Sequence, residues 1–157
     1  MPSQAKAQTE RLPSSAYVVT ELKDPPMPSA AFKEMYSRFA RRVLWMDGNV
    51  VPGAFQMNTA WYFAVPEKSP VFEEHVHDTD EIIGFMGSDP DHPYDLGAEL
   101  EVWVDGEKHT LTTSTMIFCP AGMPHMPLTI KRVDRPVFHF SVVTSPAYDA
   151  GAYGGTV

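Results

Sequence analysis

The chain has 157 residues, a length that suits one domain around a single hydrophobic core. Its 43% hydrophobic and 20% charged residues exclude an intrinsically disordered chain. The net charge is -8 and the Lys and Arg residues are scattered, so neither nucleic acid nor a membrane is expected as a partner.

The single cysteine, Cys119, excludes an intrachain disulfide and lies in the apolar run MIFCP. We expect it to be a buried, inert thiol. The first 15 residues contain no apolar segment typical of a signal peptide, and no apolar run approaches the ~20 residues that span a bilayer. The default expectation is therefore a cytoplasmic protein.

The chain divides into a flexible N-terminal tail (1–14), a single domain (15–146) and a C-terminal tail (147–157). Within the domain, AYVVTEL (16–22) predicts a first strand. The apolar spacing of AAFKEMYSRFA (30–40) predicts a short helix with Ser29 as its N-cap.

Beyond residue 40, strand patterns dominate, and no further helix is expected. The predicted strands are RRVLWM (41–46), FQMNTAWYFAV (55–65), EEHVH (73–77), EIIGFMG (81–87), ELEVWV (99–104), KHTLTTS (108–114), TMIFC (115–119) and PVFHFSVV (136–143). Asp105 and Gly106 predict a tight hairpin turn between the strands 99–104 and 108–114. Many short strands separated by Gly and Pro indicate an all-β sandwich or barrel.

The segment FEEHVHDTDEI predicts a metal site. On a strand, His75 and His77 project to the same side, about 6.5–7 Å apart at Cα. Glu81 follows a short polar turn and can fold back toward them, which gives a two-histidine, one-carboxylate arrangement with open coordination positions. His125, after the Pro- and Gly-shaped turn PAGMPH, is a candidate fourth ligand. A metal-free polar pocket is the alternative.

These residues resemble the two sequence motifs of the cupin superfamily. The first motif, G-x5-H-x-H-x3,4-E-x6-G, is similar to the segment from Ser69 to Gly87, with His75, His77 and Glu81 at ligand positions. The second motif, G-x5-P-x-G-x2-H-x3-N, is similar to residues 114–129, with Pro120, Gly122 and His125 matching. Ser69 departs from the first motif, and Ser114 and Thr129 depart from the second, all at turn or strand-end positions. Gly87 comes one residue earlier than the first motif requires.

The resemblance implies a small single-domain cupin: an antiparallel β-barrel of the double-stranded β-helix (jelly-roll) type, here with a short N-terminal helix. It further implies one divalent metal ion per chain, with Fe(II) favoured and Mn, Ni, Zn or Cu as alternatives, and a homodimer. The segment between the motifs (87–99) is longer than usual, and we expect it to form a loop over the barrel rim or at a dimer contact.

A substrate pocket is predicted beside the metal ligands. Gln56, Asn58 and Tyr62 share one strand face, and Trp61, on the same strand, is a further substrate-binding candidate. His139, between two phenylalanines in the last strand, is a candidate acid or base together with Tyr62. The alternatives are that the strand face is exposed to solvent and that His139 is a satisfied core or surface histidine.

Three function classes follow. The first is an Fe(II) dioxygenase-type oxidoreductase that acts on a small phenolic, enolic or diketone-like metabolite. The second is a metal-dependent isomerase, lyase or cyclase that uses the ion as a Lewis acid. The third is a non-catalytic module that binds a small molecule.

Overall fold

The structure is a computed structural model that describes residues 11–25 and 27–145. The predicted tail 147–157, and all but residues 11–14 of the predicted tail 1–14, lie outside the described residues. A short 3-10 helix, η1 (Ser14–Tyr17), stands where a strand over 16–22 was predicted, so that prediction was wrong. Tyr17 and Val18 are exposed, and the segment therefore has no buried face to pair with a sheet.

The predicted helix is confirmed as α1 (Ala30–Phe39). Its start is fixed by Ser29, whose side-chain oxygen accepts a hydrogen bond from the Phe32 amide at 3.0 Å. Phe32, Tyr36 and Phe39 lie on one side of the helix and are buried. None of the helices in the described part of the chain is long and apolar enough to cross a membrane.

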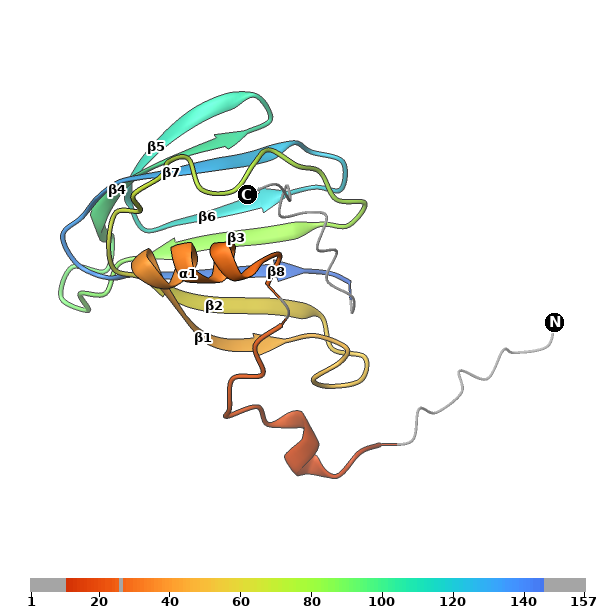
Figure 1. Ribbon diagram of the computed structural model, residues 1–157. Coiled ribbons are helices and arrows are strands. Elements are labelled where there is room, and N and C mark those ends of the chain that lie inside the picture. The colour runs from red at the N-terminus through yellow and green to blue at the C-terminus, as the bar shows by residue number, and fades with distance from the viewer. Residues whose placement is uncertain (1–10, 26, 146–157) are drawn as a thin grey trace.

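A five-stranded antiparallel sheet forms one layer of the molecule (Figure 1). Its strands, in spatial order, are β1 (Ala40–Met46), β2 (Gln56–Tyr62), β8 (Val137–Val143), β3 (Glu81–Met86) and β6 (Thr115–Cys119). All five were predicted within a few residues. Aromatic and apolar β-branched side chains are frequent in these strands, as expected for a sheet that packs on a core.

The second layer is a three-stranded sheet in the order β5 (Glu107–Thr113), β4 (Asp95–Val104) and β7 (His125–Val133). Asp105 (φ 49°) and Gly106 (φ 79°) form the predicted tight turn between β4 and β5. Strand β7 was not predicted, because Pro124 and Pro127 at its start are typical of a turn.

Residues 73–77 are not a regular strand, which corrects another prediction. The chain from Val71 to His77 instead contacts β7 at two isolated bridges, Val71 to Leu128 and His75 to His125. It thereby extends the three-stranded sheet beyond β7 and places both histidines of the first motif opposite the start of β3. Buried side chains from both sheets, including Ile83, Phe85 and Leu100, fill the space between the layers.

The predicted loop over residues 87–99 is shorter than expected, because β4 already begins at Asp95. Ser114 fixes this loop: its hydroxyl accepts a hydrogen bond from the Gly87 amide (2.9 Å) and donates one to the Pro93 carbonyl (2.7 Å). A side chain at Gly87 would collide with the Asp95 carbonyl. The serine in place of the motif glycine therefore connects β6 to the loop.

Candidate metal centre

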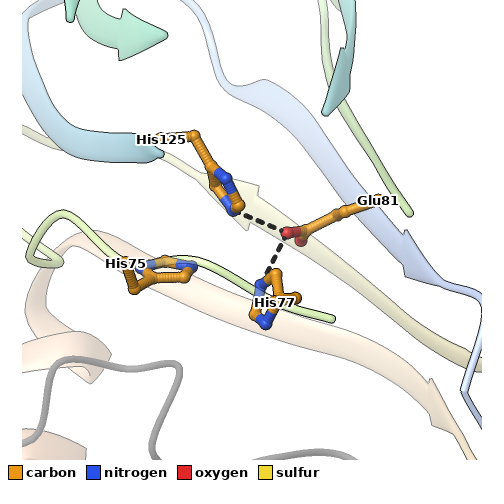
Figure 2. Close-up of side chains that lie close together, drawn as sticks. All are labelled: His75, His77, Glu81 and His125. Carbon is orange, nitrogen blue, oxygen red and sulfur yellow. Dashed lines mark hydrogen bonds and ion pairs between the residues drawn. The ribbon is translucent and has the colours of Figure 1, made fainter. Parts of the chain in front are cut away.

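Four side chains converge between the two sheets, and they are the four predicted metal ligands: His75, His77, Glu81 and His125 (Figure 2). One ligand atom from each lies within 4.8 Å of all the others. The two sheets and the segment beside β7 each contribute, so the cluster exists only once the sandwich has formed. Sequence spacing predicted all four residues.

Backbone carbonyls orient two of the imidazoles. The Nδ1 of His75 lies 2.8 Å from the Glu73 carbonyl, and the Nδ1 of His125 lies 2.9 Å from the Met123 carbonyl. A carbonyl only accepts, so each Nδ1 carries the proton and donates it. The Nε2 atoms of both rings are thereby assigned to the cluster, an arrangement that is typical of metal-binding histidines.

Glu81 is the first residue of β3 and lies 8% exposed between the sheets. One of its carboxylate oxygens, Oε2, lies 3.0 Å from the Nε2 of His77 and 2.9 Å from the Nε2 of His125. The two imidazoles donate to the same oxygen. One carboxylate oxygen thus lies at the meeting point of two Nε2 atoms.

Burial and neighbouring polar groups shift the pKa values of three residues of the cluster. Burial alone would raise the pKa of Glu81, but the hydrogen bonds from His125 and His77 hold this pKa well below its usual value. Burial alone would lower the pKa of His125, but Cys119 and Glu81 beside the ring raise it well above the ordinary value. Burial lowers the pKa of His75. At neutral pH the carboxylate is therefore ionised.

The donor set fits a divalent transition metal. Three imidazole nitrogens and one carboxylate oxygen would suit iron, manganese, nickel, zinc or copper, and a set of four protein ligands would leave coordination positions open for other molecules. The ionised carboxylate supplies a negative charge to the ion. These residues could therefore hold a metal ion at the point that the imidazole protons now occupy.

A cavity of about 50 Å³ adjoins the cluster and is lined by His75, His77 and Glu81. Its remaining polar wall comes from Asn58, Tyr62, His139 and Ser141. Its apolar wall comes from Tyr36, Phe72, Ile83 and Met126. The predicted pocket residues Asn58, Tyr62 and His139 thus lie in one cavity with the candidate ligands, as the shared strand face indicated.

His139 is 6% exposed and lies between two aromatic rings, with Tyr62 at 4.9 Å and Phe85 at 5.1 Å between ring centroids. Its Nδ1–H donates to the Gly84 carbonyl at 3.0 Å. Burial lowers the pKa of His139 to about 4, although the Gly84 carbonyl opposes this effect. At neutral pH the ring is therefore uncharged. His139 is a core histidine whose Nδ1 proton is hydrogen-bonded, and its ring also lines the cavity.

Asn58 is oriented by an arginine that sequence reasoning missed. Arg42 is buried, its Nε–H donates to the Asn58 side-chain oxygen at 2.9 Å, and its guanidinium forms an ion pair with Asp24. Because the oxygen of Asn58 is engaged by Arg42, its NH₂ group is the part left for other partners. The signal in the sequence was an arginine at an inward position of the alternating strand β1.

Two predicted substrate-binding residues lie outside this cavity. Gln56 is fully buried on the inner face of β2, and neither its amide oxygen nor its amide nitrogen has a hydrogen-bond partner, but it does not line the cavity. Trp61 projects from the outer face of the five-stranded sheet and packs on Phe138. Alternation along β2 places its ring on the side opposite Tyr62, which corrects the assignment of Trp61 to the pocket.

The comparisons with known proteins identify the fold. An oxalate oxidase in complex with the substrate analogue glycolate matches with a TM-score of 0.50 and 14% identity over 87% of this chain and 65% of that chain. KdgF from Halomonas sp. matches with a TM-score of 0.42 and 17% identity over 70% of this chain and 81% of its own. An RmlC-like cupin from Shewanella frigidimarina matches with a TM-score of 0.38 and 17% identity over 60% of this chain and 68% of that one.

No family model matches the sequence, and no curated protein does. The architecture and the match to the oxalate oxidase at a TM-score of 0.50 nevertheless agree on the fold: the chain has the cupin fold, a β-sandwich of the jelly-roll type. Its candidate metal centre lies between the two sheets, as the motif resemblance implied.

Proposed function

We propose that this chain is a metal-dependent cupin enzyme, an Fe(II) dioxygenase-type oxidoreductase for a small enolic, diketone-like or phenolic metabolite. The observation that carries the proposal is the convergence of three imidazole nitrogens and the Glu81 carboxylate on one point beside a cavity. An Fe(II) ion at that point would supply redox chemistry with dioxygen. Everything else in the reaction depends on the residues of the cavity wall.

The size of the cavity favours the smaller members of this substrate class. Its volume is about 50 Å³, whereas a cavity that holds benzene measures ~150 Å³. A short enol or diketone therefore fits with less rearrangement than a phenol. Phe72 and Met126, in the apolar wall, are the side chains whose movement would enlarge the cavity.

Two residues of the wall would handle protons and orientation. The neutral ring of His139 donates through Nδ1 to Gly84, which leaves Nε2 as an acceptor for a substrate hydroxyl. Its low pKa makes it a weak base, so we assign it the holding of a hydrogen bond more than full proton removal. Asn58, held by Arg42, would donate its NH₂ hydrogens to a substrate oxygen.

The test begins with elemental analysis of protein purified without added metal. Protein loaded anaerobically with Fe(II) is then screened with short diketones, enols and phenols on an oxygen electrode. We expect oxygen uptake that depends on both protein and substrate. The His75→Ala, His77→Ala double variant is the control. Oxygen uptake no greater than that of free Fe(II) with every compound would overturn the proposal.

Variants of the wall separate chemistry from metal binding. Tyr62→Phe should keep the bound metal and lower turnover ~10²-fold, the usual effect of losing a group that handles a proton. His139→Gln should also keep the metal and should lower turnover less, because His139 is assigned a hydrogen bond to the substrate and not full proton removal. Turnover without oxygen would instead support a metal-dependent isomerase, lyase or cyclase, for which the same residues would move the proton. Substrate binding without any turnover would indicate a non-catalytic binding protein.

A further inference from the structure

A second pocket lies at one end of the outer face of the five-stranded sheet, on the side of β2 opposite the metal centre. It has a volume of about 430 Å³ and is lined by Arg41, Trp61, Phe63, Ser88 and Pro136. We propose that this pocket is a binding site for a small aromatic carboxylate. None of its five lining residues is a candidate metal ligand or lines the cavity beside those ligands.

Four strands that run side by side contribute to the pocket, namely β1, β2, β8 and β3 (Figure 1). Arg41 lies near the start of β1, and Trp61 and Phe63 lie at and just beyond the end of β2. Pro136 directly precedes β8, and Ser88 follows β3 by two residues. Because each strand is antiparallel to its neighbours, these four strand ends meet at the same end of the sheet.

Two aromatic side chains line the pocket on one side of the sheet. Trp61 pairs directly with Arg41, so both project to the outer face. The guanidinium carbon of Arg41 lies 5.8 Å from the centre of the Phe63 ring, which places Phe63 on this face as well. Trp61 and Phe63 are 37% and 38% exposed, so both rings are accessible to a ligand.

The Trp61 ring is oriented before any ligand arrives. It meets Phe138 edge to face, with 5.2 Å between the ring centroids, and Phe138 in turn lies 6.4 Å from Phe140. A ring that is held by its neighbours loses little conformational freedom when a ligand stacks on it. The pocket therefore favours a ligand with a flat apolar ring.

Arg41 gives the pocket a positive charge that no carboxylate neutralises. Its neighbour in sequence, Arg42, forms an ion pair with Asp24 on the inner side of the sheet. In the described part of the chain, no carboxylate forms such a pair with Arg41. None of the five lining residues is acidic, although the whole chain has 20 acidic and 12 basic residues. The charge of the pocket therefore favours an anionic ligand.

The loop that carries Ser88 is fixed by the fold. The amide of the preceding residue, Gly87, donates to the hydroxyl of Ser114 at 2.9 Å, and that hydroxyl donates to the Pro93 carbonyl at 2.7 Å. Ser88 thus adds a hydroxyl, which can donate or accept a hydrogen bond, at a fixed place on the rim of the pocket.

These features together define the class of ligand. The planar guanidinium of Arg41 matches the two oxygens of a carboxylate, and the aromatic rings beside it match an aromatic ring. Pockets that bind small molecules measure roughly 300–1,000 Å³, and this pocket lies in that range. The cavity beside the metal centre, at about 50 Å³, is too small for an aromatic ring without rearrangement.

Calorimetric titration of the full, unmodified chain with naphthoate tests the proposal. We expect saturable binding at one site per chain with a Kd below ~1 mM, as is usual for a ligand of this size. Naphthylmethanol has the same rings without the charge, and cyclohexanecarboxylate has the charge without an aromatic ring. Each should bind at least ~10-fold more weakly. Absence of saturable naphthoate binding, or equal affinity for either comparison compound, would overturn the proposal.

Two variants separate the contributions of charge and ring. Arg41→Gln should weaken naphthoate binding at least ~10-fold and leave naphthylmethanol binding unchanged, because only the carboxylate needs the cation. Trp61→Ala should weaken the binding of both compounds. The controls are Lys33→Gln, at an exposed cation on α1, and Trp103→Ala, at a tryptophan that is 39% exposed on the other sheet. Both controls should bind naphthoate as the unmodified chain does.

The tryptophan indole signals in an NMR spectrum locate the site on the unmodified chain, whether or not a variant folds. The chain has three tryptophans. Naphthoate should shift the Nε1–H signal of Trp61 and leave those of Trp103 and of Trp45, which donates to Asp47 at 3.0 Å, in place. Binding that leaves the Trp61 signal unmoved, or full affinity in a folded Arg41→Gln variant, would contradict the assignment of this pocket.

Discussion

Glu81 combines two roles at the scale of the residue. Its Oε2 accepts hydrogen bonds from the Nε2 atoms of His77 and His125, so this oxygen links three of the four candidate ligands. Its ionised carboxylate would also supply a negatively charged ligand to a bound metal ion. The same oxygen is thus the acceptor for two imidazole protons and a candidate metal ligand, so protons and a metal would compete for it.

Each of the four candidate ligands should be necessary for tight metal binding. Replacing His75, His77, Glu81 or His125 by Ala should lower the bound metal measured by elemental analysis, and a second replacement should add little once the site is lost. His109→Ala, at an exposed histidine on β5, is the matched control and should retain full occupancy. Full occupancy in the His75→Ala, His77→Ala variant would contradict the ligand assignment.

Metal affinity should rise with pH through and above neutrality. The pKa of His125 lies above its ordinary value in the metal-free protein, so a metal must displace its proton even at pH 7. The apparent affinity should increase by up to ~tenfold per pH unit for each proton released. Titration with Zn(II) at several pH values measures this slope. An affinity that stays constant above pH 7 would mean that His125 is not a ligand.

His139 should make the fold sensitive to acid. Its pKa is about 4 in the folded chain, below the unfolded value of ~6.5, so the unfolded chain binds the proton first as pH falls. The stability it contributes is present above pH ~6.5 and is lost as pH falls through about 4, at roughly 1.4 kcal/mol per pH unit. Urea unfolding of His139→Gln should therefore show a smaller loss of stability between pH 6.5 and 4.5.

The matched control for this measurement is His109→Gln, which changes an exposed histidine outside the core. It should keep the pH dependence of the unmodified protein. If the free energy of unfolding depended on pH equally in the His139 and His109 variants, burial of the His139 ring would not govern acid sensitivity.

At the scale of the element, helix α1 contributes to the cavity, because Tyr36 on its buried side forms part of the cavity wall. Its start depends on the hydrogen bond from the Phe32 amide to Ser29. Ser29→Ala should lower the free energy of unfolding, measured in urea, by about 1 kcal/mol, the usual value of an N-cap.

The control for the cap is Ser37→Ala, which changes an exposed serine inside the same helix. Alanine has the higher helix propensity at an interior position, so this variant should be no less stable than the unmodified protein. Equal losses of stability in both variants would contradict the capping role of Ser29.

At the scale of the whole molecule, the metal ligands come from segments that only the folded sandwich brings together. A metal that binds the folded chain alone should stabilise it by ~2.7 kcal/mol at a free metal concentration of 100 times Kd. Thermal unfolding with and without Zn(II) should therefore show a higher Tm with the metal, reversed by a chelator. A variant lacking both His75 and His77 should show no such shift, and an equal shift in that variant would place the metal elsewhere.

The sequence by itself determined the features that depend on local spacing. The spacing of His75, His77 and Glu81, the helix capped by Ser29 and the turn at Asp105 and Gly106 follow from chemistry within a few residues. Alternation along β2 also placed Asn58 and Tyr62 on one face. These predictions succeeded because neighbours along the chain set the geometry.

The tertiary structure decided what depends on distant partners. Strand β7 forms despite Pro124 and Pro127 because β4 pairs with it, whereas residues 16–22 pair with no strand in the described part of the chain and form none there. The sequence could not show that Arg42 would reach Asn58 and Asp24 inside the sandwich. Strand alternation gives the two faces of a strand, but only the packing of the two sheets against each other decides which face meets the core.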